Sequence, residues 1–174
     1  SLDNVPRVSP WLGSLRHYDL RANRVGPYVG VTFRDVTRYV NATSQLAESE
    51  ILFRTAMEAS AVGMGLHDET GVFLRVNPAL CRILQRDADQ IVGRRVLDLV
   101  HPDDAEHVHQ AGPALEAKPG EPVSMELRLL TARGEPVWVR ASGALVPEQD
   151  HRPFHLITHF VDVTIEQAQR AELE

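Results

Sequence analysis

The chain has little of several residue types, and each scarcity excludes a class of protein. Cys81 is the only cysteine, so neither an internal disulfide nor a multi-cysteine zinc site can form. No apolar run approaches the roughly 18 residues of a membrane-spanning helix, and no signal peptide opens the chain. The net charge of −6 disfavours nucleic acid as a partner, because phosphates require basic surfaces. These features predict a cytoplasmic protein without a membrane span.

The composition is that of a globular domain. Of the 174 residues, 43% are hydrophobic and 24% are charged, which excludes collagen-like and disordered polar chains. The length suits one domain, or one domain with a fragment of another. The chain starts at Ser1 and ends inside a helical pattern. We therefore expect it to be part of a longer polypeptide.

The first third predicts a hairpin followed by a helix. Residues 1–13 carry Pro6, Pro10 and Gly13, and are expected to be irregular. Residues 14–36 predict two strands around a Gly-Pro turn. From about residue 37 to residue 60, apolar and small residues recur at the three-four spacing of an amphipathic helix. A pair of strands alone is marginally stable in water, so this hairpin needs a partner surface.

The middle of the chain predicts another hairpin and several short helices. Residues 63–76 alternate around an Asp-Glu-Thr-Gly turn. Residues 77–92 read as helical, with Asn77 as the cap and Pro78 in the first turn. A further helix is expected from His101 to about residue 117, ended or kinked at Gly112-Pro113.

Three strands and a helix complete the pattern. Apolar residues alternate over residues 123–129, 137–145 and 154–160. A last helix is expected from Thr164, with Gln167 at the spacing of a capping box. Strands at both ends with helices between them predict an α+β domain built on an antiparallel sheet.

A short repeat links the two ends of the chain. The segments 32–37 and 159–164 share Phe, Asp, Val and Thr in the same order, with a shift of 127 residues from Asp35 to Asp162. Each segment ends a predicted strand and precedes a predicted helix. Because the shift is about the length of a small domain, the repeat indicates two copies of one domain.

Residues 50–164 resemble a PAS domain of the bacterial sensory-box type. The resemblance rests on several segments in the order of that family. They are Asn77 to Leu84, Asp89 to Gly93, Val96 to Asp104 with its His-Pro-Asp-Asp sequence, Gly134 to Trp138, and Asp162-Val163-Thr164. The resemblance implies a five-stranded antiparallel sheet with short helices on one side and an N-terminal linker helix.

The resemblance also implies a division of the chain. Residues 1–37 look like the last strands of a preceding PAS domain, and residues 38–60 like the amphipathic linker helix. Residues 61–164 form the complete PAS domain, and residues 165–174 begin an outgoing signalling helix. In this arrangement the unpaired hairpin would add to another sheet, such as that of a partner chain.

The repeated segment supplies the first candidate functional residues. Asp35 and Thr37 in one copy, and Asp162 and Thr164 in the other, stand where the last strand changes into a helix. These side chains can cap free backbone N–H groups there. By resemblance we expect the same junction to transfer a signal from the domain to the helix.

A second candidate is a surface for packing and dimer formation. Trp138 falls on the outer face of its predicted strand, where an exposed indole needs cover. The helix that carries Leu46 and Phe53, or a second subunit, is expected to supply that cover. The sequence thus predicts a homodimer through these residues.

The family's cofactors can be compared with the residues present. A flavin adduct of the LOV type needs a cysteine where this sequence has Val96, and Cys81 lies too early. That photochemistry is therefore excluded. Haem needs an axial ligand, and His107 stands where haem-binding relatives carry theirs, although a solvated helix face explains it too. No cofactor is required by the sequence, and no metal site is expected.

The function implied is that of a sensory or relay module in a multidomain bacterial signalling protein. The module would bind a small molecule, or pass on a dimer conformation, to an output domain outside this chain. That output would be a histidine kinase or a GGDEF/EAL cyclic-di-GMP enzyme. The chain itself carries no recognisable catalytic motif, so it is not expected to be an enzyme. The alternatives are an interaction-only dimerisation module with a packed core, and a haem-based gas sensor.

Overall fold

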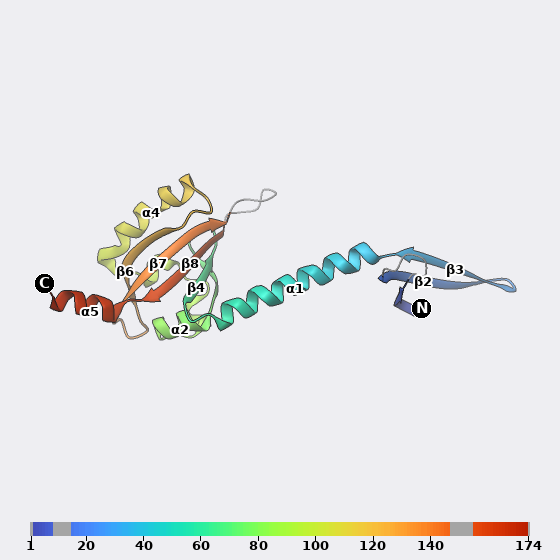
Figure 1. The fold of residues 1–174 in the computed structure, drawn as a ribbon, viewed down its shortest axis with the longest axis horizontal. Helices are drawn as coiled ribbons and strands as arrows, with labels where there is room; N and C mark the ends of the chain where they lie inside the picture. Colours follow the sequence, from blue (N-terminus) through green and yellow to red (C-terminus); the bar gives the residue numbers. More distant parts are fainter. Residues whose placement is uncertain (1, 9–14, 147–154, 174) are drawn as a thin grey trace. The chain divides into compact units, whose positions relative to one another are not determined.

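The structure divides the chain into two compact units. A computed structural model describes residues 2–8, 15–146 and 155–173. The units are Ser1–Thr55 and Ala56–Glu174, and each contains its own antiparallel sheet (Figure 1). Helix α1 (Thr37–Ala59) is continuous from the first unit into the second, where its last turn buries Met57. Its bounds agree with the predicted helix.

The first unit is a three-stranded sheet in the order β1-β2-β3. The strands are β1 (Leu2–Val8), β2 (Leu15–Val25) and β3 (Tyr28–Asp35). Gly26 has a φ of 62°, a value that glycine adopts freely, and this closes the tight turn between β2 and β3. The hairpin was expected, but the prediction of irregular structure was wrong for residues 2–8. Pro6 argued against a strand here, because proline has no backbone N–H to donate a hydrogen bond to a neighbouring strand. Proline is tolerated at a sheet edge, where β1 lies.

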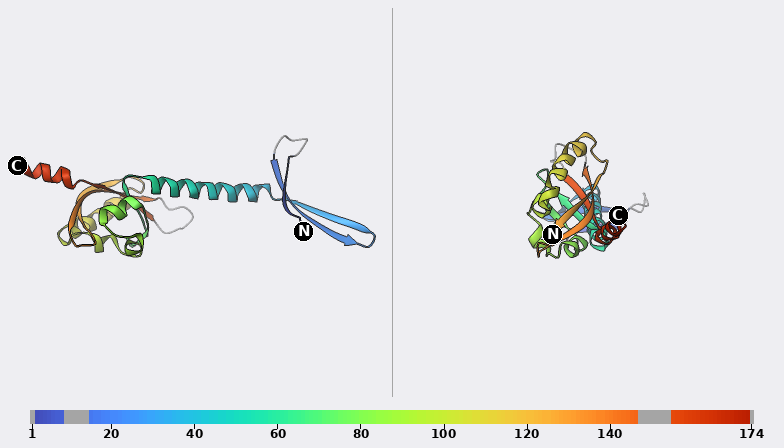
Figure 2. Two further views of the ribbon diagram at one scale, coloured as in Figure 1. Left: turned by 90° about the horizontal axis from the view of Figure 1, so that it is seen from below. Right: turned by 90° about the vertical axis from the view of Figure 1, so that its left-hand side faces the viewer.

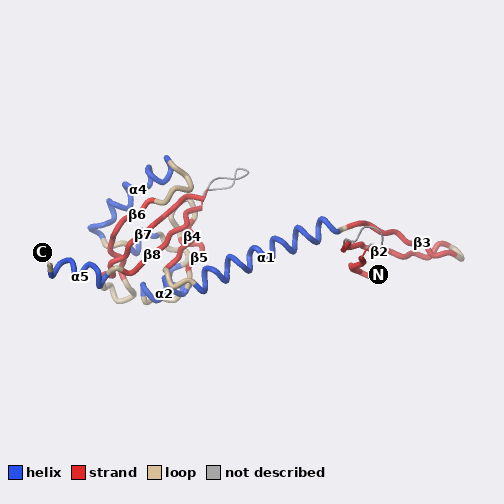
Figure 3. The backbone as a smooth tube through the Cα atoms, viewed as in Figure 1, coloured by secondary structure: helices blue, strands red, loops and turns tan. Residues whose placement is uncertain are grey.

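The second unit contains a five-stranded antiparallel sheet in the order β5-β4-β8-β7-β6 (Figure 3). The strands are β4 (Gly63–His67), β5 (Phe73–Val76), β6 (Val123–Leu130), β7 (Pro136–Val146) and β8 (His155–Asp162). Phe154, which was expected to begin the last strand, lies outside the described residues. The α+β fold with a five-stranded antiparallel sheet is confirmed.

Short helices connect β5 to β6 and gather on one face of this sheet (Figure 2). They are α2 (Pro78–Leu84), α3 (Ala88–Ile91), α4 (Ala105–Ala117) and two 3₁₀ turns, η1 (Val96–Leu99) and η2 (Pro102–Asp104). Helix α5 (Thr164–Glu172) follows β8. Phe73, Leu80, Ile91 and Phe160 belong to the buried cluster between these helices and the sheet.

Two helical predictions need correction. The pattern over residues 77–92 forms two helices, because Gln85 adopts the left-handed conformation with a φ of 53° and ends α2. The helix that was expected to end or kink at Gly112-Pro113 does not end there, because α4 continues through Pro113. The preceding Gly112 explains this, because it has no Cβ to clash with the proline ring in the helical conformation.

Asn77 connects three elements at the entrance to the second unit. Its Oδ1 accepts hydrogen bonds from the backbone N–H of Leu80 at 3.0 Å and of Met64 at 2.8 Å. Its Nδ2 donates to the carbonyl oxygens of Met57 at 3.0 Å and Val62 at 2.8 Å. The amide therefore caps α2, as the sequence predicted. It also ties the end of α1 to β4, which the sequence did not reveal.

Candidate functional site

A cavity of about 560 Å³ lies between the inner face of the sheet and the helices. This volume falls within the roughly 300–1,000 Å³ of ordinary small-molecule sites. Strands β6, β7 and β8 form its floor, and α4 and η1 form its opposite wall. The apolar lining includes Val96, Val108, Leu115, Met125, Leu127, Leu145, Leu156 and Phe160.

Small residues on β7 keep the floor of the cavity low. Ala141 and Gly143 line it where neighbouring strands carry larger side chains. A Cβ on Gly143 would come within 3.3 Å of both Leu156 Cδ1 and Thr158 Cγ2, a tight approach. The residue choice on this strand thus leaves room for a ligand.

The polar groups of the cavity lie mainly at its rim. Glu69, Arg95, His109 and Glu116 line it and are exposed to solvent. On the buried floor, Thr158 carries a hydroxyl among apolar neighbours. An apolar interior with charged groups of both signs at its mouth fits an amphipathic organic molecule.

The hydroxyl of Thr158 is held by a buried histidine. His67 Nε2 lies 2.6 Å from Thr158 Oγ1, and that hydroxyl lies 3.4 Å from the carbonyl oxygen of Gly65. The imidazole also packs against Phe73, with ring centroids 4.1 Å apart. Burial lowers the pKa of His67 from 6.5 to about 4, because the charged ring would lose its hydration. The imidazole is therefore neutral at physiological pH.

The junction between β8 and α5 is closed by three hydrogen bonds. Thr164 N donates to Asp162 Oδ1 at 2.9 Å, and Val163 N donates to the carbonyl oxygen of Trp138 at 2.9 Å. Trp138 N in turn donates to Thr164 Oγ1 at 3.2 Å. The Asp162 side chain thus joins the end of β8 to the start of α5, and the Thr164 side chain joins α5 to β7. The capping box expected at Thr164 does not form, since its hydroxyl is used by β7.

The junction between β3 and α1 has the same three bonds. Thr37 N donates to Asp35 Oδ1 at 3.0 Å, Val36 N to the carbonyl oxygen of His17 at 2.8 Å, and His17 N to Thr37 Oγ1 at 2.8 Å. Hydrogen bonds from Thr37, and then from Arg16, lower the pKa of Asp35 to about 2. The four residues singled out by the repeat therefore form two equivalent junctions.

Helix α5 is also held to the outer face of the sheet by a network around Glu126. Arg140 contacts Glu126 Oε1 at 2.9 Å and Glu166 Oε2 at 3.0 Å. Arg170 lies 3.5 Å from Glu126 Oε2, which also accepts a hydrogen bond from the Gln167 amide. Hydrogen bonding to Arg140 lowers the pKa of Glu126. No local sequence pattern marks this network, because its members come from β6, β7 and α5.

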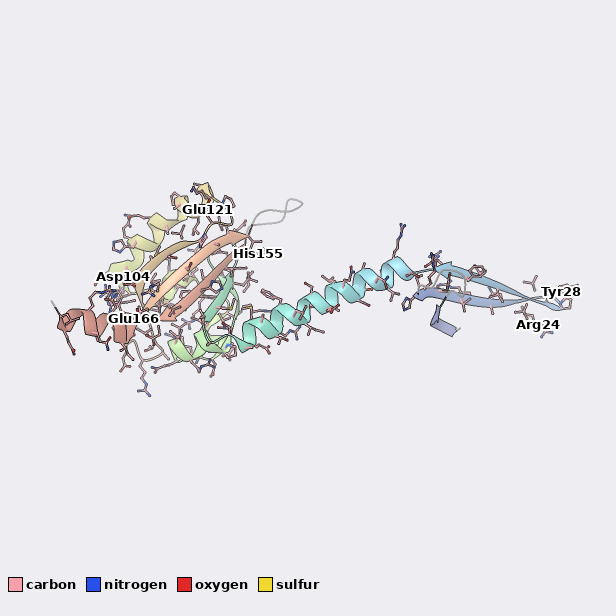
Figure 4. The ribbon with its side chains drawn as sticks, in the orientation of Figure 1. Arg24, Tyr28, Asp104, Glu121, His155 and Glu166 are labelled. Carbon is pink, nitrogen blue, oxygen red and sulfur yellow. The ribbon has the colours of Figure 1, made fainter. Side chains whose placement is uncertain are left out.

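Asp104 and Arg128 form a second ion pair that sequence reasoning missed. Arg128 donates from Nη2 to Asp104 Oδ1 at 2.7 Å and from Nε to Asp104 Oδ2 at 3.0 Å. This bidentate bonding lowers the pKa of Asp104. Figure 4 labels Asp104 and Glu166 at the end of the sheet where α5 begins, and Glu121 and His155 at the opposite end. Charged contacts thus concentrate beside the junction.

The guanidinium of Arg128 also lies 5.3 Å from the ring of Trp138. This cation–π contact covers an indole for which a helix or second subunit was expected. Trp138 is half-buried on the outer face of β7, as predicted. On α1, Leu46 is 71% exposed and Phe53 is 41% exposed.

The candidate cofactor residues differ in their position relative to the cavity. Val96 lines the cavity at the position where a flavin adduct would require cysteine. Cys81 packs against the core from α2, and burial raises the pKa of its thiol. Among the described residues, Val108 and His109 line the cavity, whereas His107 is exposed and is not part of the lining. These positions do not fit a flavin adduct, and they place His109 nearer the cavity than the proposed haem ligand.

The described residues offer neither a metal site nor a membrane-spanning helix. No three His, Cys, Asp or Glu side chains in that part of the chain gather as a metal site requires. Each helix described is too short or too polar to span a bilayer.

The sheet, the helices on one face and the enclosed cavity define a sensory fold. A family model described as the PAS fold matches residues 73–159. The chain belongs to the PAS family. It carries a sensory domain of the kind found in signalling proteins.

Two relatives extend this comparison. The probable diguanylate cyclase DgcE of Escherichia coli is 33% identical over 118 residues, which are 68% of this chain and 11% of that protein. A blue-light-activated histidine kinase of Brucella abortus is 29% identical over 135 residues, 74% of this chain and 27% of that protein. The chain thus spans a small part of the length of each relative.

Solved structures agree on the fold. The PAS domain of an HTR-like protein from Haloarcula marismortui has a TM-score of 0.59 at 18% identity, covering 70% of this chain and 98% of that one. A domain of a sensory box sensor histidine kinase/response regulator from Geobacter sulfurreducens has a TM-score of 0.56 at 22% identity, covering 67% of this chain and 96% of that one.

Proposed function

We propose that the cavity binds a small amphipathic molecule and that its occupancy is relayed through the β8–α5 junction to an output domain. The observation that carries this proposal is that the cavity and the junction share the same strands. On β8, Phe160 lines the cavity and Asp162 closes the junction. Two residues of extended strand span about 7 Å, so a shift at the floor reaches the junction directly.

The network around Glu126 provides a second connection. Met125 and Leu127 line the cavity from β6, and Glu126 lies between them on the opposite face. A ligand that moves β6 therefore also moves the anchor of Arg140 and α5. The cavity favours this function over the alternative of a module whose core is filled by its own side chains.

Filling the cavity tests ligand binding. Ala141→Leu places a larger side chain on the floor, and Ala144→Leu makes the same change on the opposite face of β7. We expect Ala141→Leu to weaken binding of the uncharged probe N-phenyl-1-naphthylamine by about tenfold or more, since it occupies the ligand's space. Ala144→Leu should bind as the wild type does. Native mass spectrometry of the wild type would show any ligand retained from the cell. Equal probe binding by both variants would refute the cavity as the site.

Loosening the junction tests the relay. Thr164→Val removes the oxygen that accepts from Trp138 N, and Asp162→Asn weakens the cap on Thr164 N. Both variants should raise amide hydrogen exchange in α5 while the exchange of the core strands stays unchanged. In the full-length protein they should uncouple output from ligand. Thr37→Val is the matched variant at the first junction and should act on α1 instead.

The output domain and the dimer are the remaining parts of the proposal. The names of the two relatives favour a histidine kinase or a cyclic-di-GMP enzyme as the output, in a bacterial protein. We further propose that the module works in the cytoplasm. A homodimer would bury the exposed Leu46 and Phe53 of α1, seven residues apart on one helix face. Sedimentation of Leu46→Arg should then show dissociation, with Ser44→Arg as the control. A wild-type monomer at high concentration would refute the dimer.

A further inference from the structure

The sheet of the first unit repeats the register of the cavity floor. Strands β2 and β7 both have 11 residues, and β3 and β8 both have 8. Phe33 pairs with Leu20, as Phe160 pairs with Ala141, and the same offset continues along both ladders. Both sheets then end in the same hydrogen-bonded junction. The resemblance between these strands therefore extends to every pair around the repeated segment.

The sheet of the first unit also has one mainly apolar and one mainly polar face. Alternate residues of β2 and β3 form what we call the β2–β3 apolar face: Leu20, Ala22, Val29, Val31 and Phe33, with Arg24 at its turn end. The opposite face carries Asp19, Arg21, Asn23, Thr32 and Arg34, with Val25 and Tyr28 beside the turn. In the second unit, the positions equivalent to the apolar face are the floor of the cavity: Ala141, Gly143, Leu156, Thr158 and Phe160.

The two equivalent faces differ sharply in exposure. Phe33 is 69% exposed, whereas Phe160 is 2% exposed beneath the helices of the second unit. Val29 and Val31 are 69% and 58% exposed. A contiguous exposed apolar surface marks an interaction site, because its burial would remove apolar area from water.

We propose that the β2–β3 apolar face docks the helical half of a second PAS copy, a segment that precedes Ser1 in the same polypeptide. The partner segment is expected to resemble residues 63–122, because the helices in that range cover the equivalent face in the complete copy. A strand equivalent to β4 would pair with the edge of β3, as β4 pairs with β8. The relatives leave room for such a segment, because this chain spans only 11% and 27% of their lengths.

A segment of the same polypeptide fits better than a second copy of this chain. In the complete domain, the covering half directly precedes the strands that it covers. A second copy of this chain would have to offer residues 63–122, which already cover their own sheet.

Cysteine labelling measures whether the face is covered. The single cysteine is first removed by Cys81→Ala, and then Phe33→Cys on the apolar face is compared with its neighbour Thr32→Cys on the polar face. Maleimide labelling rates are measured in this 174-residue chain and in the full-length gene product. In the full-length protein, the thiol of Phe33→Cys should react at about one tenth of its rate in the 174-residue chain, or more slowly still. This slowing is expected for a site that must open before it can be labelled. The thiol of Thr32→Cys should react at the same rate in both.

Each other outcome overturns the proposal. Fast labelling of Phe33→Cys in the full-length protein would mean that the face stays open. Protection that appears in the 174-residue chain and rises with its concentration would assign the face to a second copy. Equal protection of the Phe33→Cys and Thr32→Cys thiols would mean that both faces of the sheet are shielded alike, so that no partner docks specifically on the apolar face. If Phe33→Cys does not fold, Val31→Cys tests the same face.

Discussion

His67 makes the stability of the second unit depend on pH. Its imidazole is buried, and burial lowers its pKa from 6.5 to about 4, while the Gly71 backbone and Asp68 act in the opposite direction. The unfolded chain therefore takes up a proton on this residue at a higher pH than the folded chain does. Stability is fully retained above pH 6.5 and falls as the pH drops from there to about 4.

The size of this effect follows from the shift in pKa. The change from 6.5 to about 4 corresponds to about 3 kcal/mol in the free energy of unfolding. Between pH 8 and pH 5, the loss is about 2 kcal/mol, because the unfolded state is then mostly protonated and the folded state mostly neutral. The variant His67→Leu removes this titration and keeps an apolar side chain of similar size.

Urea unfolding at pH 8 and pH 5 measures the difference. Trp138 reports on the second unit once Trp11→Phe has removed the other tryptophan. The loss of stability should be about 2 kcal/mol smaller in His67→Leu than in the parent protein. His107→Leu, on the exposed side of α4, keeps His67 and should keep its pH dependence.

Equal pH dependence in His67→Leu and the parent would refute the reasoning. If the variant does not fold, an NMR titration of the His67 ring in the wild type gives the same answer. A pKa near 6.5 would show that the imidazole is hydrated or paired when charged.

Three further predictions concern packing and charge. Gly65→Ala should destabilise the second unit by about 1–3 kcal/mol, because its new methyl would lie 2.7 Å from an aromatic carbon; an unchanged melting temperature would contradict this. Asp104→Asn should cost about 1–3 kcal/mol in urea unfolding by weakening the bidentate contact with Arg128, and an equally stable variant would argue against that pair. Thr37→Val should raise the pKa of Asp35 from about 2 towards 3.8 in an NMR titration, so that the stability lost on acidification between pH 3.8 and pH 2 becomes smaller; an unmoved pKa would mean that other contacts dominate.

Local patterns predicted most elements of the fold. Gly26 and Gly71 stand in turns with positive φ, and Asn77 caps α2 as its sequence position indicated. The strand at residues 2–8 was missed, because its pairing with β2 is decided by a distant partner and its own pattern is interrupted by Pro6. Pro113 was expected to end or kink its helix, and the helix does not end there.

The candidate site was predicted unevenly. The four junction residues were found because a repeated sequence marks them, and the bond from the Thr N–H to the Asp carboxylate is local in each copy. His67, Glu126 and the pair of Asp104 with Arg128 gave no such signal. Each acquires its role from a partner on another element, such as Thr158 for His67. Strand alternation over Gly63–His67 offered the only hint, since it places His67 on the same face as two glycines.

The sequence by itself determined the family, the order of the elements and the two equivalent junctions, because these depend on periodicity, turn residues and short-range caps. Only the tertiary structure decided that the sheet encloses a cavity, that a neutral histidine holds its floor, and that Glu126 anchors the outgoing helix. It also decided that Phe33 and Phe160, which occupy the same position in the repeated segment, differ in exposure. The physical reason is that burial, pKa and cavity volume are properties of what packs against a residue, and strand pairing brings those partners from distant parts of the chain.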